Sequence, residues 1–269
     1  MLRRALKMTF WVAYDHLGKL LVVNVCIALV LLAPGSLALG AFLSEDLAVA
    51  FYLGIPLLGV TLGVVWPVLA AGLAHMVKEL IDTRDGAVRA FFTGLRLYGC
   101  RAAGVGVCLL AAACCLGASA VFYAYQLRAR APWLGYGLSA AALWGLVFVF
   151  LVSLLAMPAL VQKRAGVWAT LKLSALLVLD NPFYALGLAP WFILLMVISL
   201  APPIFFLLAP AVAVVLASSA YEMLSRKYAA RDARGKPAAA HAHAAVDFND
   251  AEDDYLNRGL RDLLFPWKN

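Results

Sequence analysis

Charged residues are scarce in this sequence, and they are absent from the centres of its long apolar runs. Only 14% of the 269 residues are charged, whereas 65% are hydrophobic. An ionisable side chain inside a membrane is costly and usually marks an ion or proton pathway. The absence of Asp, Glu, Lys and Arg from the centres of the runs therefore argues against a proton-coupled pump or antiporter.

The sequence also lacks the motifs of common catalytic and metal centres. It contains no H-E-x-x-H, G-x-S-x-G or G-x-x-x-x-G-K-[ST] pattern, so no metal or serine hydrolase is indicated. The five cysteines have no C-x-x-C spacing and lie in or beside apolar runs, as small hydrophobic residues do. His241 and His243 have no further ligands nearby. We therefore predict a protein that is not an enzyme and that binds no metal or cofactor.

What the sequence has in abundance is apolar residues. The mean hydropathy is +0.89, and soluble domains are nearer half apolar and a quarter charged. A bilayer core about 30 Å thick needs roughly 20 apolar helical residues per span. Six runs meet this need: Leu20–Leu39, Val49–Met76, Ala102–Tyr123, Leu134–Leu160, Tyr184–Leu200 and Ile204–Leu224. We predict an all-α polytopic membrane protein with about six spans. Five is the competing count, because only a double proline separates the last two runs.

The distribution of positive charge predicts the orientation of these spans. If the N-terminus is cytoplasmic, only Arg128 and Arg130 of the 22 Lys and Arg residues lie outside. This fits the positive-inside rule and predicts a multi-pass protein of a bacterial inner membrane with both termini in the cytoplasm. The net charge of +7 is concentrated beside apolar runs, which favours anionic lipid as its partner over nucleic acid.

Amphipathic segments precede the first, third and fifth predicted spans, near residues 2–17, 88–98 and 168–178. Apolar stripes flanked by basic residues are typical of helices at an anionic membrane surface. One interpretation is a threefold unit of cytoplasmic helix and hairpin; the other is ordinary interfacial helices. We divide the chain into a membrane domain (1–227), a flexible linker (228–249) and a cytoplasmic amphipathic tail helix (250–269). Leu260, Leu264 and Trp267 of the tail could dock on the membrane or on a partner.

Three residues within the predicted spans could have a packing or path-lining role. Asn24 is the only carboxamide there, and we expect it either to form a hydrogen bond between helices or to line a substrate path. Gly59 and Gly63 form a Gly-x-x-x-Gly pair, which predicts close helix packing, with dimerisation as the lesser alternative.

Residues 66–73 (WPVLAAGL) and 85–95 (DGAVRAFFTGL) resemble the YesL family, and the looser resemblance extends over most of residues 8–225. Residues 44–60 and the tail fall outside the family pattern. The resemblance implies a bacterial multispan membrane protein of no established function. Members are often linked with sugar-uptake systems, so it also implies a weak connection to carbohydrate uptake.

Two functions follow as hypotheses. The first is an accessory or scaffold membrane protein that binds another membrane or cytoplasmic protein. The second is a permease-like transport subunit, because Asp85 followed by Phe91 and Phe92 is similar to the cytoplasmic coupling loop of binding-protein-dependent permeases. Leu80 stands where that loop begins with Glu-Ala-Ala. Both hypotheses make Asp85, Phe91 and Phe92 candidate partner-docking residues.

Overall fold

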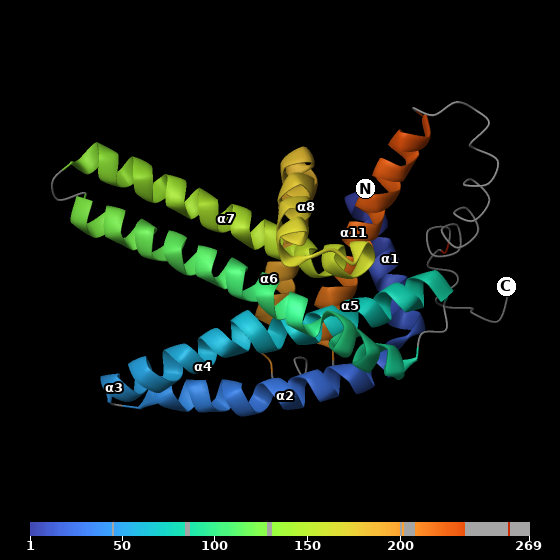
Figure 1. The fold of residues 1–269 in the computed structure, drawn as a ribbon, viewed down its shortest axis with the longest axis horizontal. Helices are drawn as coiled ribbons and strands as arrows, with labels where there is room; N and C mark the ends of the chain where they lie inside the picture. The colour runs from blue at the N-terminus through green and yellow to red at the C-terminus, as the bar shows by residue number, and fades with distance from the viewer. Residues whose placement is uncertain are drawn as a thin grey trace.

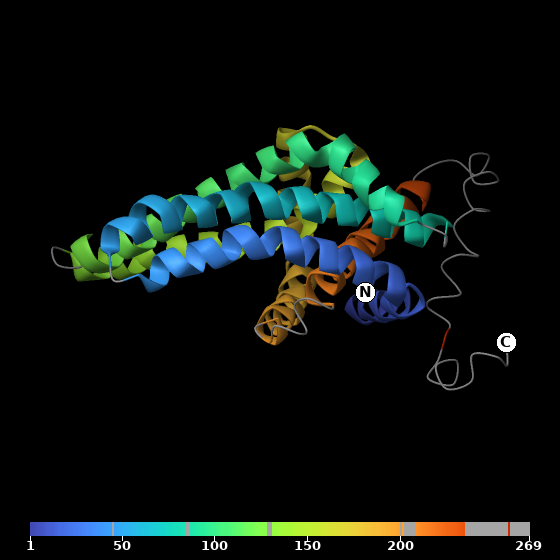
Figure 2. The same ribbon diagram turned by 90° about the horizontal axis from the view of Figure 1, so that it is seen from below.

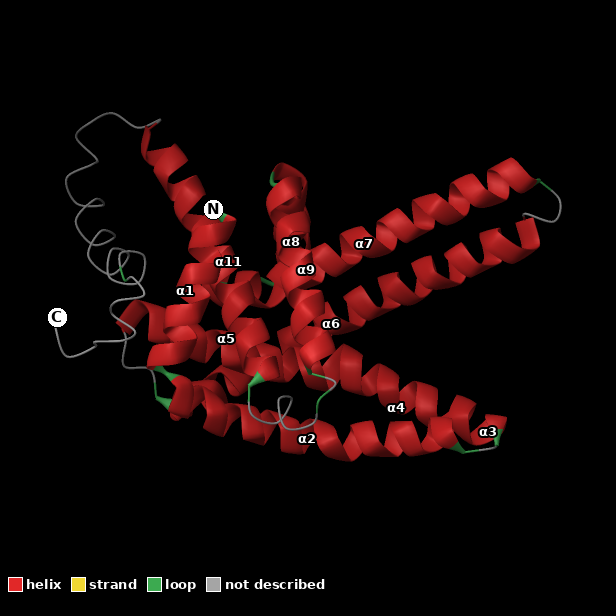
Figure 3. Cartoon of the chain, turned by 180° about the vertical axis from the view of Figure 1, so that it is seen from behind, coloured by secondary structure: helices red, strands yellow, loops and turns green. Residues whose placement is uncertain are grey.

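The computed structural model describes residues 1–44, 46–83, 87–127, 131–199, 201, 208–234 and 258. All elements in these ranges are helices, and Figure 3 shows helices and loops without a strand among them. The predicted all-α fold is confirmed. The α-helices are α1 (Leu2–Asp15), α2 (Leu17–Leu43), α3 (Leu47–Val49), α4 (Ile55–Val60), α5 (Trp66–Thr83), α6 (Val88–Phe122), α7 (Pro132–Lys163), α8 (Val167–Asp180), α9 (Pro182–Ile198) and α11 (Ala209–Arg234). Three π-helical turns, η1 (Ala50–Gly54), η2 (Thr61–Val65) and η3 (Tyr123–Leu127), interrupt or extend them.

Two long hairpins dominate the molecule. Helix α2 pairs with the row α3 to α5, and α6 pairs with α7 (Figure 1). The hairpins are joined where α5 packs along α6, and from there their arms diverge toward the tips on the left of Figure 1. Seen from below, the hairpins overlap and α9 projects to one side of them (Figure 2). The N-terminus lies at the joined end of the hairpins (Figure 1).

Four helical stretches are long and apolar enough to cross a membrane: Leu17–Leu43, Leu47–Thr83, Val88–Leu127 and Pro132–Lys163. They coincide with the first four predicted spans. A fifth is present if α8 and α9, which meet at an angle of 104°, count as one bent span. Only 17% of the most apolar window of Leu47–Thr83, and of Val88–Leu127, is buried within the chain. Apolar surface on this scale indicates surroundings that are themselves apolar, which fits a membrane protein.

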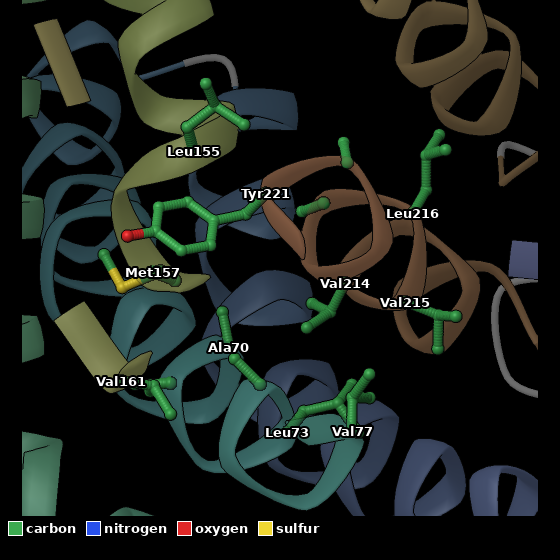
Figure 4. Packing of buried hydrophobic residues seen from close by; sticks show 14 of the residues in the cluster. Ala70, Leu73, Val77, Leu155, Met157, Val161, Val214, Val215, Leu216 and Tyr221 are labelled. Atoms are coloured by element: carbon green, nitrogen blue, oxygen red, sulfur yellow. The ribbon is translucent and has the colours of Figure 1, made fainter. Parts of the chain in front are cut away.

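The buried core lies where the two hairpins meet α1 and α11. We call this core the hub. Figure 4 shows its centre, where side chains of α5, α7 and α11 interdigitate: Ala70, Leu73, Val77, Leu155, Met157, Val161, Val214, Val215, Leu216 and Tyr221. The hub joins segments that are distant in the sequence.

The three predicted amphipathic segments are not built alike. Helix α1 ends at Asp15, and α8 ends at the bend before α9, but the middle segment continues into α6 without a break. Helix α1 also buries Ala5, Met8 and Val12 in the hub, where it packs along α11. One face of α1 is therefore covered by the protein itself. Among the described residues, the three amphipathic segments do not share one arrangement of helix and hairpin.

Helix α11 extends to Arg234. The first part of the predicted linker, which begins at residue 228, is therefore helical. Apart from Arg258, the predicted tail helix and its residues Leu260, Leu264 and Trp267 lie outside the described residues. The guanidinium of Arg258 pairs with the carboxylate of Asp15 and lies 5.4 Å from the ring centroid of Trp11.

Candidate functional site

Polar side chains that connect one helix with another gather in and around the hub. The Tyr98 hydroxyl of α6 donates to the carbonyl of Val161 at 3.3 Å. The Tyr184 hydroxyl of α9 donates to the carbonyl of Ala220 at 3.1 Å. Each bond pairs a buried polar group that would otherwise cost stability, and each fixes one helix against another.

The end of α7 is shaped by a left-handed residue. Arg164 has a φ of 50°, a conformation that ends a helix, and Gly166 follows before α8 begins. The guanidinium of Arg101 donates to the Arg164 carbonyl at 3.2 Å, so that α6 holds this turn in place. The turn sends α8 away from the axis of α7 and leaves Lys163 beside the angle between them.

Glu222 connects α11 with α7. Its carboxylate accepts from the amide of Gln162 at 3.2 Å and from the guanidinium of Arg226 at 2.9 Å. Asp82 lies past the apolar run of α5 at an exposed position. Partial desolvation raises the pKa of its carboxyl, Lys78 lowers this pKa, and Glu222 raises it. The acidic groups of α5 and α11 are thus close enough to influence one another, with Lys78 and Arg226 offsetting them.

A second polar network holds the bend between α8 and α9 against α11. The Tyr228 hydroxyl donates to the carboxylate of Asp180, and the Asn181 amide donates to the Tyr228 oxygen at 2.7 Å. The ammonium of Lys227 donates to the Asn181 carbonyl oxygen. Asn181 also donates to the carbonyl of Leu177 at 3.2 Å, which satisfies the last turn of α8. The network fixes the distance between α8 and α11.

An open hollow of about 530 Å³ lies between α8 and α11, beside the end of α7. Its size falls within the roughly 300–1,000 Å³ typical of ligand sites. Polar and apolar side chains line it together: Lys163, Leu173, Leu176, Leu177, Asp180, Tyr221, Ser225, Tyr228 and Ala229. With one cation, one carboxylate, hydroxyls and a leucine wall, it is suited to an amphiphilic ligand. We take it as the candidate site.

Asn24 lies fully buried at a helix interface. Its side-chain oxygen accepts from the backbone N–H of Ala211, in the first turn of α11, at 2.8 Å. The first amides of a helix have no partner within that helix, and Pro210 has no N–H at all. Asn24 therefore caps α11 from a different helix, which corresponds to the packing role expected for it.

The two glycines of the Gly-x-x-x-Gly pair differ in surroundings. A Cβ atom on Gly63 would lie 2.9 Å from Leu110 of α6, whereas one on Gly59 would meet nothing within 4 Å. Gly63 serves packing within the chain, opposite Gly106. A Cβ on Gly106 would lie 2.3 Å from the carbonyl oxygen of Gly63. Gly106 was not predicted as a packing residue, although it lies in the same helix as Gly94, another closely packed glycine of α6.

The candidate partner-docking residues are dispersed. Asp85 lies outside the described residues, as do the three residues of the tail. The Phe91 side chain is 2% exposed and belongs to the hub, so it presents no surface to a partner. Phe92 is 50% exposed, so among the described docking candidates it alone presents its side chain to the surface.

Lys163, Asp180, Tyr221 and Tyr228 were missed by sequence reasoning. They lie in three segments that share no motif, and only the polar pair Asp180-Asn181 between two apolar runs gives a signal of their importance. Within the described ranges, no group of three or more His, Cys, Asp or Glu residues could hold a metal ion. No protein family model, curated protein or solved structure matches the chain, and the resemblance to the YesL family stays a prediction.

Proposed function

We propose that the chain is a six-span scaffold protein of a bacterial inner membrane, with both termini in the cytoplasm and no catalytic activity of its own. One observation supports the proposal: polar groups form hydrogen bonds between helices around the hub, while the arms of the hairpins present mainly apolar side chains. Such an arrangement suits a rigid platform held by lipid-facing helices more than a path for ions.

The surface for a partner is proposed on the cytoplasmic side of the hub. Phe92 is half exposed there, and Trp168 at the start of α8 is 79% exposed. Arg89 and Arg96 share the helix of Phe92, so the same face can also attract anionic lipid. Exposed aromatic residues near arginine are typical of interaction surfaces. Through its resemblance to the YesL family, the partner is expected to belong to a carbohydrate-uptake system.

A permease-like transport subunit is the alternative, in which an ATPase would dock at Asp85, Phe91 and Phe92. The burial of Phe91 removes one of the two aromatic contacts on which that docking would depend.

Photo-crosslinking in cells tests both functions. Benzoylphenylalanine in place of Phe92 is expected to form a discrete adduct with one protein, because this side chain is exposed beside basic residues. The matched control is Phe122, which is 55% exposed in the arm of α6 and is expected to contact lipid alone. An adduct with an ATP-binding subunit would support the transport alternative. Lipid adducts alone at both positions would contradict the scaffold.

The six-span orientation predicts the accessibility of four engineered cysteines in a background without native cysteine. Glu45→Cys, Ala129→Cys and Pro202→Cys should react with an impermeant maleimide added to intact cells. Gly166→Cys, between α7 and α8, should react only after lysis. Labelling of the first three from the cytoplasmic side would refute the orientation, and protection of Pro202→Cys alone would reduce the count to four spans.

A further inference from the structure

We propose that the hollow between α7, α8 and α11 binds phosphatidylethanolamine, a zwitterionic phospholipid, by its headgroup. The inference rests on the side chains that line the hollow and does not depend on the scaffold function. It gives the chain a specific lipid site in addition to any general attraction between its basic surface and anionic lipid.

The hollow contains a pair of opposite charges. Lys163 and Asp180 line the same hollow, but within the described part of the chain neither forms an ion pair with the other or with a third group. Asp180 accepts one hydrogen bond, from the Tyr228 hydroxyl, which leaves further acceptor capacity on its carboxylate. A ligand with a negative and a positive group would pair both side chains at once. Phosphoethanolamine has this composition, with the phosphate for Lys163 and the ammonium for Asp180.

The hydroxyl of Tyr221 is a further polar group at the hollow. Tyr221 is 2% exposed and lines the hollow, and it has no hydrogen-bond partner among the described residues. Figure 4 shows its ring reaching from α11 toward Leu155 and Met157 of α7. A tyrosine hydroxyl can both donate and accept, so one that lines a hollow and has no partner among the described residues can bond with a ligand oxygen. Ser225, one turn further along α11, adds a second hydroxyl to the same wall.

The apolar wall of the hollow favours a lipid over a soluble zwitterion. Leu173, Leu176 and Leu177 of α8 line the hollow. The apolar surface continues outward through exposed side chains, because Leu176 is 52%, Leu179 64% and Phe183 89% exposed. An acyl chain could follow this surface from the headgroup into the bilayer, and burying it there is favourable by the hydrophobic effect.

The chemistry also predicts which headgroups are rejected. Phosphatidylglycerol can satisfy Lys163 but has no cation for Asp180. The quaternary ammonium of phosphatidylcholine has a charge but no N–H to donate. Because hydrogen bonds to charged groups are the stronger ones, each of these lipids should bind about tenfold more weakly than phosphatidylethanolamine.

Native mass spectrometry of the full chain in detergent, delipidated and titrated separately with the three dioleoyl lipids, tests the proposal. Lys163→Ala is expected to weaken phosphatidylethanolamine binding about tenfold. Asp180→Asn should abolish the preference over phosphatidylglycerol, and its amide oxygen can still accept from Tyr228. Tyr221→Phe, which removes only the hydroxyl, should weaken binding severalfold. The control is Lys172→Ala, an exposed residue of α8 outside the hollow, which should leave binding unchanged.

Circular dichroism and size-exclusion chromatography of each variant establish that the fold is retained. Equal binding of all three lipids to the unchanged chain would overturn the proposal, as would equal effects of Lys163→Ala and Lys172→Ala. Tight binding of phosphatidylethanolamine and phosphatidylglycerol alike, lost in Lys163→Ala and unaffected by Asp180→Asn, would show a phosphate site and also overturn it.

Discussion

Gly106→Ala is expected to lower the stability of the joined hairpins by about 2–3 kcal/mol, the upper part of the range for overpacked cores. The added Cβ would lie 2.3 Å from both the Gly63 carbonyl oxygen and the Pro67 Cγ. Neither group can rotate away, since one is backbone and the other is a proline ring. Helix α6 must therefore move from the row of helices that contains η2 and α5. Thermal unfolding in a mild detergent, followed by circular dichroism, measures the loss.

Two other glycines serve as controls for Gly106. A Cβ on Gly117, further along α6, or on Gly59, in α4, would meet nothing within 4 Å. Alanine at either position should leave the melting temperature unchanged or raise it, because glycine lowers helix stability by up to about 1 kcal/mol. If Gly106→Ala and Gly117→Ala have the same melting temperature, the close contact of α6 with η2 and α5 does not exist in the detergent-solubilised protein.

Asn24→Leu is expected to destabilise the chain by about 1–3 kcal/mol, the cost of leaving a buried polar group unpaired. Leucine has a similar volume but cannot accept from the Ala211 N–H, and position 24 is fully buried. The loss should be local at first. Hydrogen–deuterium exchange should therefore increase in the first turn of α11, while the amides of α6 and α7 keep their protection.

Val22→Leu is the matched control for Asn24, because Val22 lies on α2 and is 49% exposed. This change adds one methylene on a free surface and should alter neither the melting temperature nor the exchange of α11. Equal exchange in the two variants would mean that the amide of Ala211 is capped by another group.

The apolar runs predicted the fold well because hydrophobic length is a property of each segment alone. The first four runs each correspond to a helix of spanning length. Their ends were less predictable. The charges around Arg96 and Arg101 indicated a boundary between an amphipathic helix and a span, yet α6 passes through them unbroken. Arg101 reaches the turn at Arg164, a contact with a distant segment that no local pattern contains.

The site was much less accessible to sequence reasoning. Asn24 was selected because a carboxamide in an apolar run is unusual, and the structure shows its partner in α11, which lies at the other end of the chain. Tyr221 gave no such signal, since a tyrosine near the end of a membrane helix is common. Its importance depends on the distance between α8 and α11, which the bend after Asp180 sets.

Because the two hairpins diverge, the hub is packed by protein, whereas the arms are packed by the surrounding lipid or detergent. In the hub, side chains pack against other side chains of the protein. The contacts that a substitution removes there are therefore the same in every detergent or lipid. Along the arms the surrounding molecules are tails of lipid or detergent, which act as part of the packing around residues 29–44, 46–62, 107–127 and 131–147. A change of detergent should therefore shift the melting temperatures of all hub variants by the same amount. A variant of the arms should instead change rank with the length of the detergent tail.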